Sequence, residues 1–279
     1  MTTLIGFFAK AIEKEWKMRL FDILFAHPMA ILILALLFPP SEAFAQKAGD
    51  TRVPIELSGG VTVTNNGISL IPTFTLGKPA VTFDLAIGKR KLSFEPEFQF
   101  SLDGKPWTFF FWGRYKLVSN QKFFIRTGLH EALAFSNSTT TVNGVSKESI
   151  SAQRYLAGEF APNYFLTKHL GIGIYYIYSY GIDNEFVRNT NLLMFHVNFS
   201  NLKLSDQWSA SIMPQIYFLR INQNNGFNLT SSLSLVKRNF PVSFSAFVNK
   251  TLSYGIPGSK NFVWNASLIY TFHRNLVER

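Results

Sequence analysis

Apolar and polar residues alternate at every second position along most of this chain. In the clearest run, residues 91–102 (KLSFEPEFQFSL), leucine and phenylalanine occupy one face, and only Pro96 interrupts them. The other face carries Glu95, Glu97 and Gln99. Successive side chains of a β-strand point to opposite sides, so this run predicts a strand between water and an apolar phase. The same period returns about a dozen times, which predicts a membrane β-barrel.

The alternation defines thirteen candidate strands, joined mostly by short turns rich in Asn, Gly and Pro. Single-chain bacterial barrels have an even number of strands, so we expect one candidate to be miscounted. The first is the weakest, because Gly59 and Gly60 lie in its middle, and we interpret it as a bent extension of the second. The prediction is an all-β, transmembrane, antiparallel up-and-down barrel with twelve strands, or alternatively fourteen. The candidates are residues 55–64, 67–76, 80–88, 91–102, 106–118, 122–136, 150–161, 169–181, 190–201, 207–221, 226–236, 240–252 and 261–273.

A water-soluble β-sandwich would alternate in the same way, so strand length decides between the two classes. The candidates run for about ten residues or more, as a tilted membrane crossing requires, whereas strands of soluble proteins average about five or six. Aromatic residues near strand ends, such as Trp107 and Trp208, are expected at the membrane interfaces. The longer links, 137–149, 182–189 and 253–260, fall on one side, and none is long enough to predict a folded plug.

The N-terminal segment predicts an export signal. Residues 29–38 form a short apolar run, and small residues then precede Gln46. A spanning helix needs roughly 20 apolar residues, so a cleaved signal peptide fits this run better than a membrane anchor. The segment before the apolar run is unusually long for a signal peptide, and translation from Met18 would give a signal peptide of more ordinary length. We expect a signal peptide at 1–45 with cleavage after Ala45, an extension at 46–54, the barrel at 55–273 and a tail at 274–279.

Composition narrows the class of partner. The chain has no cysteine, which excludes disulfides, thiolate metal sites and a lipid-modified cysteine at the cleavage site. Its 27 basic and 17 acidic residues give a formal net charge of +10, all of it after residue 45. This charge favours anionic partners such as lipid phosphates or small anions. The basic residues are scattered and no cluster has metal-ligand spacing, so we predict no nucleic-acid partner, no metal and no cofactor.

The chain resembles the outer-membrane β-barrel proteins of Gram-negative bacteria. The resemblance covers residues 55–273 and rests on the repeated alternation, not on a diagnostic motif. Such proteins commonly end in a strand with alternating apolar residues and a terminal aromatic. Leu268, Tyr270 and Phe272 supply the alternation here, but seven further residues follow. The resemblance implies an outer-membrane location, with outer-membrane lipid and lipopolysaccharide around the barrel.

If the apolar faces meet lipid, the polar faces line the lumen. Strand parity then places acidic residues on two neighbouring strands and basic residues on the next two, close enough for cross-strand pairs at about 5 Å. One interpretation is a charged constriction that selects solutes. The other is a set of pairs that neutralise each other and brace a narrow lumen. The predicted cluster is Asp84, Glu95, Glu97, Arg114, Lys116, Arg126, His130 and Glu159, and the opposite wall, within residues 209–271, carries mostly small Ser, Thr and Asn residues.

The leading functional prediction is a porin-like pore for small polar or anionic solutes. The alternatives are a non-conducting barrel with a structural, adhesive or assembly role and, third, an outer-membrane lipid-modifying enzyme. His196, Asn198 and Ser200 form a triad-like set on one face, but parity points them into the lumen, away from lipid, so no catalytic residue is predicted. Glu131 falls on the lipid-facing side, a costly position unless it lies at the rim or a bulge shifts the register.

Overall fold

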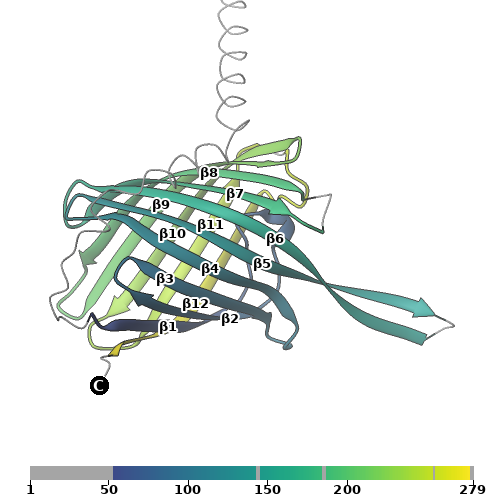
Figure 1. Cartoon of the computed structure of the whole chain (residues 1–279), viewed down its shortest axis with the longest axis horizontal. Helices are drawn as coiled ribbons and strands as arrows, with labels where there is room; N and C mark the ends of the chain where they lie inside the picture. Colours follow the sequence, from purple (N-terminus) through teal and green to yellow (C-terminus); the bar gives the residue numbers. More distant parts are fainter. Residues whose placement is uncertain (1–52, 143–144, 184–186, 254, 277–279) are drawn as a thin grey trace, which may run out of the picture. The chain divides into compact units, whose positions relative to one another are not determined.

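The structure of this chain, a computed structural model, describes residues 53–142, 145–183, 187–253 and 255–276. In this part of the chain, twelve strands form a closed antiparallel barrel in which each strand pairs with its sequence neighbours and the first pairs with the last (Figure 1). The predicted fold class and the preferred count of twelve strands are confirmed. The strands are β1 (Ile55–Thr64), β2 (Ala80–Lys89), β3 (Leu92–Ser101), β4 (Pro106–Ser119), β5 (Phe123–Val142), β6 (Val145–Phe165), β7 (Leu170–Gly181), β8 (Asn189–Lys203), β9 (Trp208–Ile221), β10 (Asn224–Lys237), β11 (Val242–Thr251) and β12 (Phe262–Leu276).

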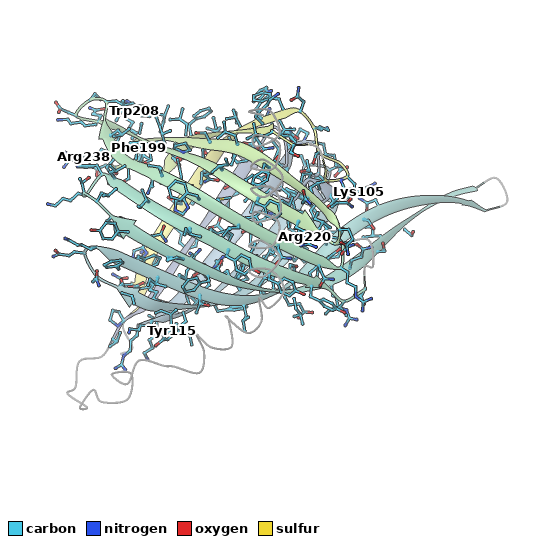
Figure 2. All side chains as sticks on the ribbon, turned by 90° about the horizontal axis from the view of Figure 1, so that it is seen from above. Lys105, Tyr115, Phe199, Trp208, Arg220 and Arg238 are labelled. Atoms are coloured by element: carbon cyan, nitrogen blue, oxygen red, sulfur yellow. The ribbon has the colours of Figure 1, made fainter. Side chains whose placement is uncertain are left out.

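The two ends of the barrel differ in their connections. We call the end where β1 begins and β12 ends the turn end, and its links are two to four residues long. The opposite end, which we call the loop end, carries the longest link, residues 65–79. In Figure 2, Trp208 and Arg238 lie at the turn end, whereas Lys105 and Arg220 lie at the loop end.

The outer face of the barrel is apolar. Phenylalanines on β3 to β5 touch one another across the strands: the rings of Phe98 and Phe109 lie 5.2 Å apart, and those of Phe109 and Phe135 lie 4.8 Å apart. Leu129 and Leu156, on β5 and β6, are each more than half exposed on this face. A closed barrel pairs its backbone groups internally and can therefore present such a surface to lipid. Among the described residues, no helix is long and apolar enough to cross a membrane.

The candidate strand at residues 67–76 is not a strand, and this prediction is wrong. Residues 65–79 form a loop with one 3-10 turn, η2 (Pro72–Phe74). The proline at position 72 is not the reason, because Pro96 and Pro214 lie inside β3 and β9; Leu70, Ile71 and Phe74 instead pack against a buried cluster of side chains. The miscounted candidate is therefore the second. The first is a regular strand of ten residues, not a bent extension of its neighbour.

Gly59 and Gly60 do not break β1, because they lie where the barrel wall is tightly packed. A Cβ atom on Gly59 would come within 2.5 Å of the Asp84 carbonyl oxygen and 2.9 Å of the Phe272 ring. A Cβ atom on Gly60 would come within 2.9 Å of the Tyr270 carbonyl oxygen. The missing side chains let β1 approach both β2 and β12, so these glycines help to close the barrel.

The strands β5 and β6 continue beyond the rest of the barrel as a long hairpin at the loop end (Figure 1). The link expected at residues 137–149 is therefore largely strand, and its backbone pairing reaches Val142 opposite Val145. The segment is rich in Thr and Val, whose branched side chains favour extended backbone.

The structure also bears on the ends of the predicted segments. The last strand, β12, runs to Leu276, three residues past the expected end of the barrel. The expected signal peptide at 1–45 and most of the extension at 46–54 lie outside the described residues.

Candidate functional site

The loop formed by residues 65–79 folds into the lumen, and we call it the lumenal loop. On one side, the Trp107 indole N–H on β4 donates a 2.8 Å hydrogen bond to the Phe74 carbonyl oxygen. On the other side, the Tyr217 hydroxyl on β9 donates a 3.0 Å hydrogen bond to the Leu70 carbonyl oxygen. Because β4 and β9 are five strands apart in the closed ring of twelve, the loop spans the lumen. The expectation that no loop forms a plug is therefore wrong.

Apolar side chains hold the lumenal loop in place. Leu70, Ile71 and Phe74 pack against a buried cluster on the inner wall and neighbouring loops. The Phe74 ring meets the Tyr155 ring edge-on, with centroids 5.1 Å apart. Burial contributes about 25 cal/mol per Å² of apolar surface, which is a sufficient reason for this segment to leave the wall. The buried cluster comprises Ala132, Tyr155, Val187, Leu192, Met194, Tyr217, Leu219, Ile221 and Ile256.

The wall formed by β10 and β11 is polar, but it is also packed at the loop end. Asn228 and Thr251 are almost fully buried there, and the Thr251 hydroxyl donates a 3.1 Å hydrogen bond to the Asn228 side-chain oxygen. The Tyr217 hydroxyl lies 3.3 Å from the side-chain oxygen of Asn249, which is also buried. Nearer the turn end, the serines of the same strands are only half-buried. The lumen is thus packed at the loop end and more open at the turn end.

Four of the predicted lumenal charges meet in one cluster in the turn-end half of the barrel. Its centre is Glu159 on β6, which is 0% exposed. Glu159 Oε1 lies 2.9 Å from both Arg114 Nε and Arg126 Nε, and Glu159 Oε2 accepts a 3.1 Å hydrogen bond from the Tyr175 hydroxyl. Arg114 also forms an ion pair with Glu95. A buried carboxylate is tolerated only with such charged and hydrogen-bonded partners, so the cluster is a coupled unit.

Gly128 makes the contact between Arg114 and Glu159 geometrically possible. Arg114 on β4, Gly128 on β5 and Glu159 on β6 lie in one row across three strands. A Cβ atom on Gly128 would come within 2.9 Å of Arg114 Cγ and 3.3 Å of Glu159 Cγ. Because Gly128 has no side chain, the side chains of Arg114 and Glu159 can meet over the lumenal face of β5. Strand parity predicted the face of each charge, but not this contact across an intervening strand.

Aromatic rings adjoin the charge cluster on the same wall. The Arg114 guanidinium lies 4.1 Å from the centre of the Trp112 ring, within the range of a cation–π contact. The Trp112 ring stacks on His130 at 3.9 Å, and the Phe110 ring lies parallel to His130 at 5.4 Å. His130 is therefore held among rings. No group of three or more His, Cys, Asp or Glu residues that could hold a metal occurs in the described part of the chain.

The remaining predicted charges lie on the same lumenal face, outside this cluster. Asp84 on β2 and Glu97 on β3 stand directly opposite one another, as their places on two neighbouring acidic strands predict, so this strand pair gives neither carboxylate a cationic partner. Glu97 accepts a hydrogen bond from the Gln99 side-chain amide. Lys116 is in register with Arg126, next to a bulge in β4. The structure thus brings together Glu95, Arg114, Arg126 and Glu159, and it leaves Asp84, Glu97 and Lys116 apart.

His196 is on the lumenal face, as parity predicted, but it does not contact a serine nucleophile. Its Nε2 lies 2.9 Å from the side-chain oxygen of Asn163 on β6. The Ser200 backbone N–H donates instead to the His169 carbonyl oxygen, at 2.9 Å. Among the described residues, the partner of this imidazole is thus an amide, whereas nucleophilic catalysis needs a hydroxyl within hydrogen-bond reach of the base.

Glu131 faces outward near the loop end. The strand β5 is in regular register with both neighbours at this residue, so no bulge turns it inward. It lies diagonally across from Arg154, which forms a 2.9 Å ion pair with Asp183 in the loop after β7. The hydrogen bonds from Arg154 hold the pKa of Asp183 down to about 2. Glu131 therefore lies beside a charged rim, which explains a carboxylate on this face.

Sequence reasoning missed the residues that hold the lumenal loop. Trp107 was expected at a membrane interface, yet it is only 8% exposed and bonds to the loop. Tyr217 was not singled out at all. Pro72 could not have served as the signal, because Pro96 and Pro214 lie inside the regular strands β3 and β9. Without that strand, residues 65–79 become a link long enough to enter the lumen.

Comparisons with known proteins give matches among solved structures. No family model matches the chain, and no curated protein matches it. The solved structures that it is similar to include a KdgM porin in complex with disordered oligogalacturonate, with 12% identity, coverage of 78% of this chain and 99% of the porin, and a TM-score of 0.47. The NanC porin has 12% identity, coverage of 80% of this chain and 100% of its own, and a TM-score of 0.42. LpxR from Salmonella typhimurium has 10% identity, coverage of 77% and 99%, and a TM-score of 0.46. These are outer-membrane β-barrel proteins, and with TM-scores below 0.5 the matches carry no conclusion about this chain.

Proposed function

We propose that this chain is an outer-membrane pore for small polar or anionic solutes, held closed in the present conformation by the lumenal loop. The observation that carries the proposal is the charged turn-end lumen inside a closed, lipid-compatible barrel, where Asp84 is exposed and Arg126 is half-buried. Short turns of such barrels face the periplasm, so we assign the turn end to that side. A solute that enters from the periplasm therefore meets the charged half of the lumen first, whereas a solute that enters from outside meets the lumenal loop first.

The preference for anions rests on Arg114, Lys116 and Arg126. These three cations line one wall, and the two carboxylates in contact with them, Glu95 and Glu159, balance only two of the three charges. A ring or wall of one sign favours solutes of the opposite sign. Asp84 and Glu97, on the neighbouring strands, bring the carboxylates of the group to four against three cations, so the preference for anions depends on the local wall of cations on β4 and β5 and not on the sum of the charges.

The membrane partners follow from the outer surface. The exposed apolar belt supports contact with outer-membrane lipid, and the charged loop-end rim around Arg154 and Asp183 supports contact with lipopolysaccharide phosphates. Both assignments belong to the proposal.

The test is single-channel recording in planar bilayers, with reversal potentials measured in a salt gradient. We expect rare unitary steps with anion preference from the wild type, and a lower anion preference from the double variant Arg114→Ala/Arg126→Ala. The matched control is Arg154→Ala, which removes a cation from the outer face of the same barrel and should leave selectivity unchanged. Equal selectivity in all three proteins would contradict the role assigned to the lumenal arginines.

A second candidate, a non-conducting barrel with a structural, adhesive or assembly role, is favoured by the packing of the loop-end half of the lumen. Deleting residues 68–76 separates the two candidates. A pore would conduct steadily once the lumenal loop is removed, whereas a structural barrel would stay silent although heat-shifted gel mobility shows that it is folded.

A further inference from the structure

A cavity of about 140 Å³ lies between the lumenal loop and the wall formed by β3 to β7. Ile71 and Phe74 line it from the loop, and Trp107, Phe110 and Tyr155 line it from the barrel wall. An apolar cavity of about 150 Å³ is large enough to bind benzene. The space is therefore of the right size for one six-membered ring, and its walls offer aromatic faces and edges to that ring.

A few polar side chains interrupt the apolar lining. Ser69 belongs to the loop, Gln99, Thr108 and Ser179 belong to β3, β4 and β7, and His130 belongs to β5. His130 is 7% exposed, and its Nδ1 is buried with no hydrogen-bond partner in the described part of the chain. A buried polar atom without a partner is destabilising, so a group that bonds to it would be favoured. A ligand hydroxyl can both donate and accept, and it suits either tautomer of the imidazole.

The lining also defines what the cavity excludes. None of its residues is Asp, Glu, Lys or Arg. The ionic groups next to the lining are already engaged: Glu97 accepts a hydrogen bond from the side-chain amide of Gln99, and Arg114 is paired with Glu159. A charged ligand would lose its hydration here without gaining an ionic partner, which is strongly unfavourable. An uncharged ligand loses little hydration free energy when it enters the cavity.

From this size, lining and charge, we infer that the cavity is a binding site for a small, uncharged, monocyclic aromatic molecule that carries a hydroxyl group. The ring packs beside the contact between Phe74 and Tyr155, in the space that Phe110 also lines, and the hydroxyl meets the polar groups beside His130. Because the lumenal loop forms one side of the cavity, the ligand bridges the loop and the wall. Ligand pockets commonly combine an apolar lining with a few polar groups that fix orientation. This inference does not depend on whether the barrel conducts.

Phenol is the probe, and alanine methyl groups report where it binds. Ala132 and Ala134 line the cavity, whereas Ala161 is buried in the turn-end half, in register with Arg126. Full-length barrel with 13C-labelled alanine methyls is titrated with phenol in detergent micelles. We expect saturable shifts of the Ala132 and Ala134 methyl signals with one common Kd, and no saturable shift of the Ala161 signal. Phenol that merely dissolves in the micelle would not produce this contrast.

A matched pair of variants tests the cavity itself. Ala134→Leu fills the space and is expected to weaken phenol binding by roughly tenfold or more, read from the Ala132 signal. Ala161→Leu adds the same volume outside the cavity and should leave the Kd unchanged. Heat-shifted gel mobility establishes that each variant is folded. The wild-type titration alone overturns the inference if Ala132 and Ala134 show no saturable shift, and equal affinities in the two variants overturn it as well.

Discussion

The Tyr217 hydroxyl on β9 donates a 3.0 Å hydrogen bond to the Leu70 carbonyl oxygen, and thereby joins the barrel wall to a loop that enters from the far side of the lumen. The same hydroxyl lies 3.3 Å from the Asn249 side-chain oxygen, and Tyr217 is 1% exposed. A single buried hydroxyl thus links β9, β11 and the lumenal loop. The position of the loop depends on contacts of this kind rather than on strand pairing.

Tyr217→Phe is expected to loosen the lumenal loop without unfolding the barrel. The change removes one hydrogen bond worth about 1 kcal/mol, which corresponds to roughly a fivefold shift between the closed and released positions of the loop. Amide hydrogen exchange measures this, because the Leu76 amide bonds to the Gly67 carbonyl oxygen within the loop. Its exchange should become roughly fivefold faster. The matched control, Tyr270→Phe on the exposed outer face, should change nothing, and an unchanged rate for Tyr217→Phe would show that this bond does not hold the loop.

Glu159→Gln is expected to be among the most destabilising single changes in the barrel. It leaves Arg114 and Arg126 close together without the shared carboxylate, and breaking a buried ion pair costs about 3–5 kcal/mol. Glu95→Gln is the comparison, because this carboxylate pairs with one arginine, accepts a 2.7 Å hydrogen bond from the Ser93 hydroxyl and is 26% exposed, so its loss should cost only about 1 kcal/mol. Urea unfolding in lipid vesicles measures both. Equal costs for the two variants would argue against a central role for Glu159.

The order of the strands was readable from the sequence, whereas the path of the lumenal loop was not. Alternation reports that one face of a segment is apolar, but not which apolar surroundings it meets. Residues 67–76 alternate like a wall strand, yet Leu70, Ile71 and Phe74 pack inside the lumen against a buried cluster from β5, β6, β8, β9 and two loops. The partners lie far away in the sequence, so a local pattern cannot identify them.

The faces of the charged residues were likewise predictable, but their pairing was not. Parity placed Arg114 and Glu159 on the lumenal side, where the structure has them. Their contact skips over β5 because Gly128 stands between them, and it requires the register of two strand pairs at once. A bulge in β4 after Lys116 adds one residue to this strand, and no turn motif in the sequence predicts it. Contacts between two strands that are separated by a third can therefore be predicted only when the register of both strand pairs is known.

The ion pair between Arg154 and Asp183 is expected to persist well into acid. Hydrogen bonds from Arg154 lower the pKa of Asp183 to about 2, below the ordinary value of about 3.9 for an aspartate. A carboxyl group with a depressed folded pKa stabilises the fold above its unfolded pKa, and this contribution is lost as the pH falls from about 4 to about 2. An NMR titration of the Asp183 carboxyl carbon should therefore show a midpoint near 2 in the wild type and a clearly higher one in Arg154→Gln, although the backbone N–H of residue 154 still donates to this carboxylate. Identical midpoints in the two proteins would contradict the assignment.

Gly128→Ala is expected to disrupt the charge cluster through a single methyl group. The new Cβ would come within 3.0 Å of the Gly113 carbonyl oxygen and 2.9 Å of Arg114 Cγ, so the arginine must move away from Glu159. Overpacking of this kind typically costs about 1–3 kcal/mol, and here it also weakens a buried ion pair. Gly113→Ala is the matched control, because it lies on the neighbouring strand and its Cβ would meet no atom closer than 3.9 Å. Urea unfolding should show a loss of about 1–3 kcal/mol for Gly128→Ala and little change for Gly113→Ala. If both variants are equally stable, Arg114 reaches Glu159 by a route that does not depend on the missing side chain.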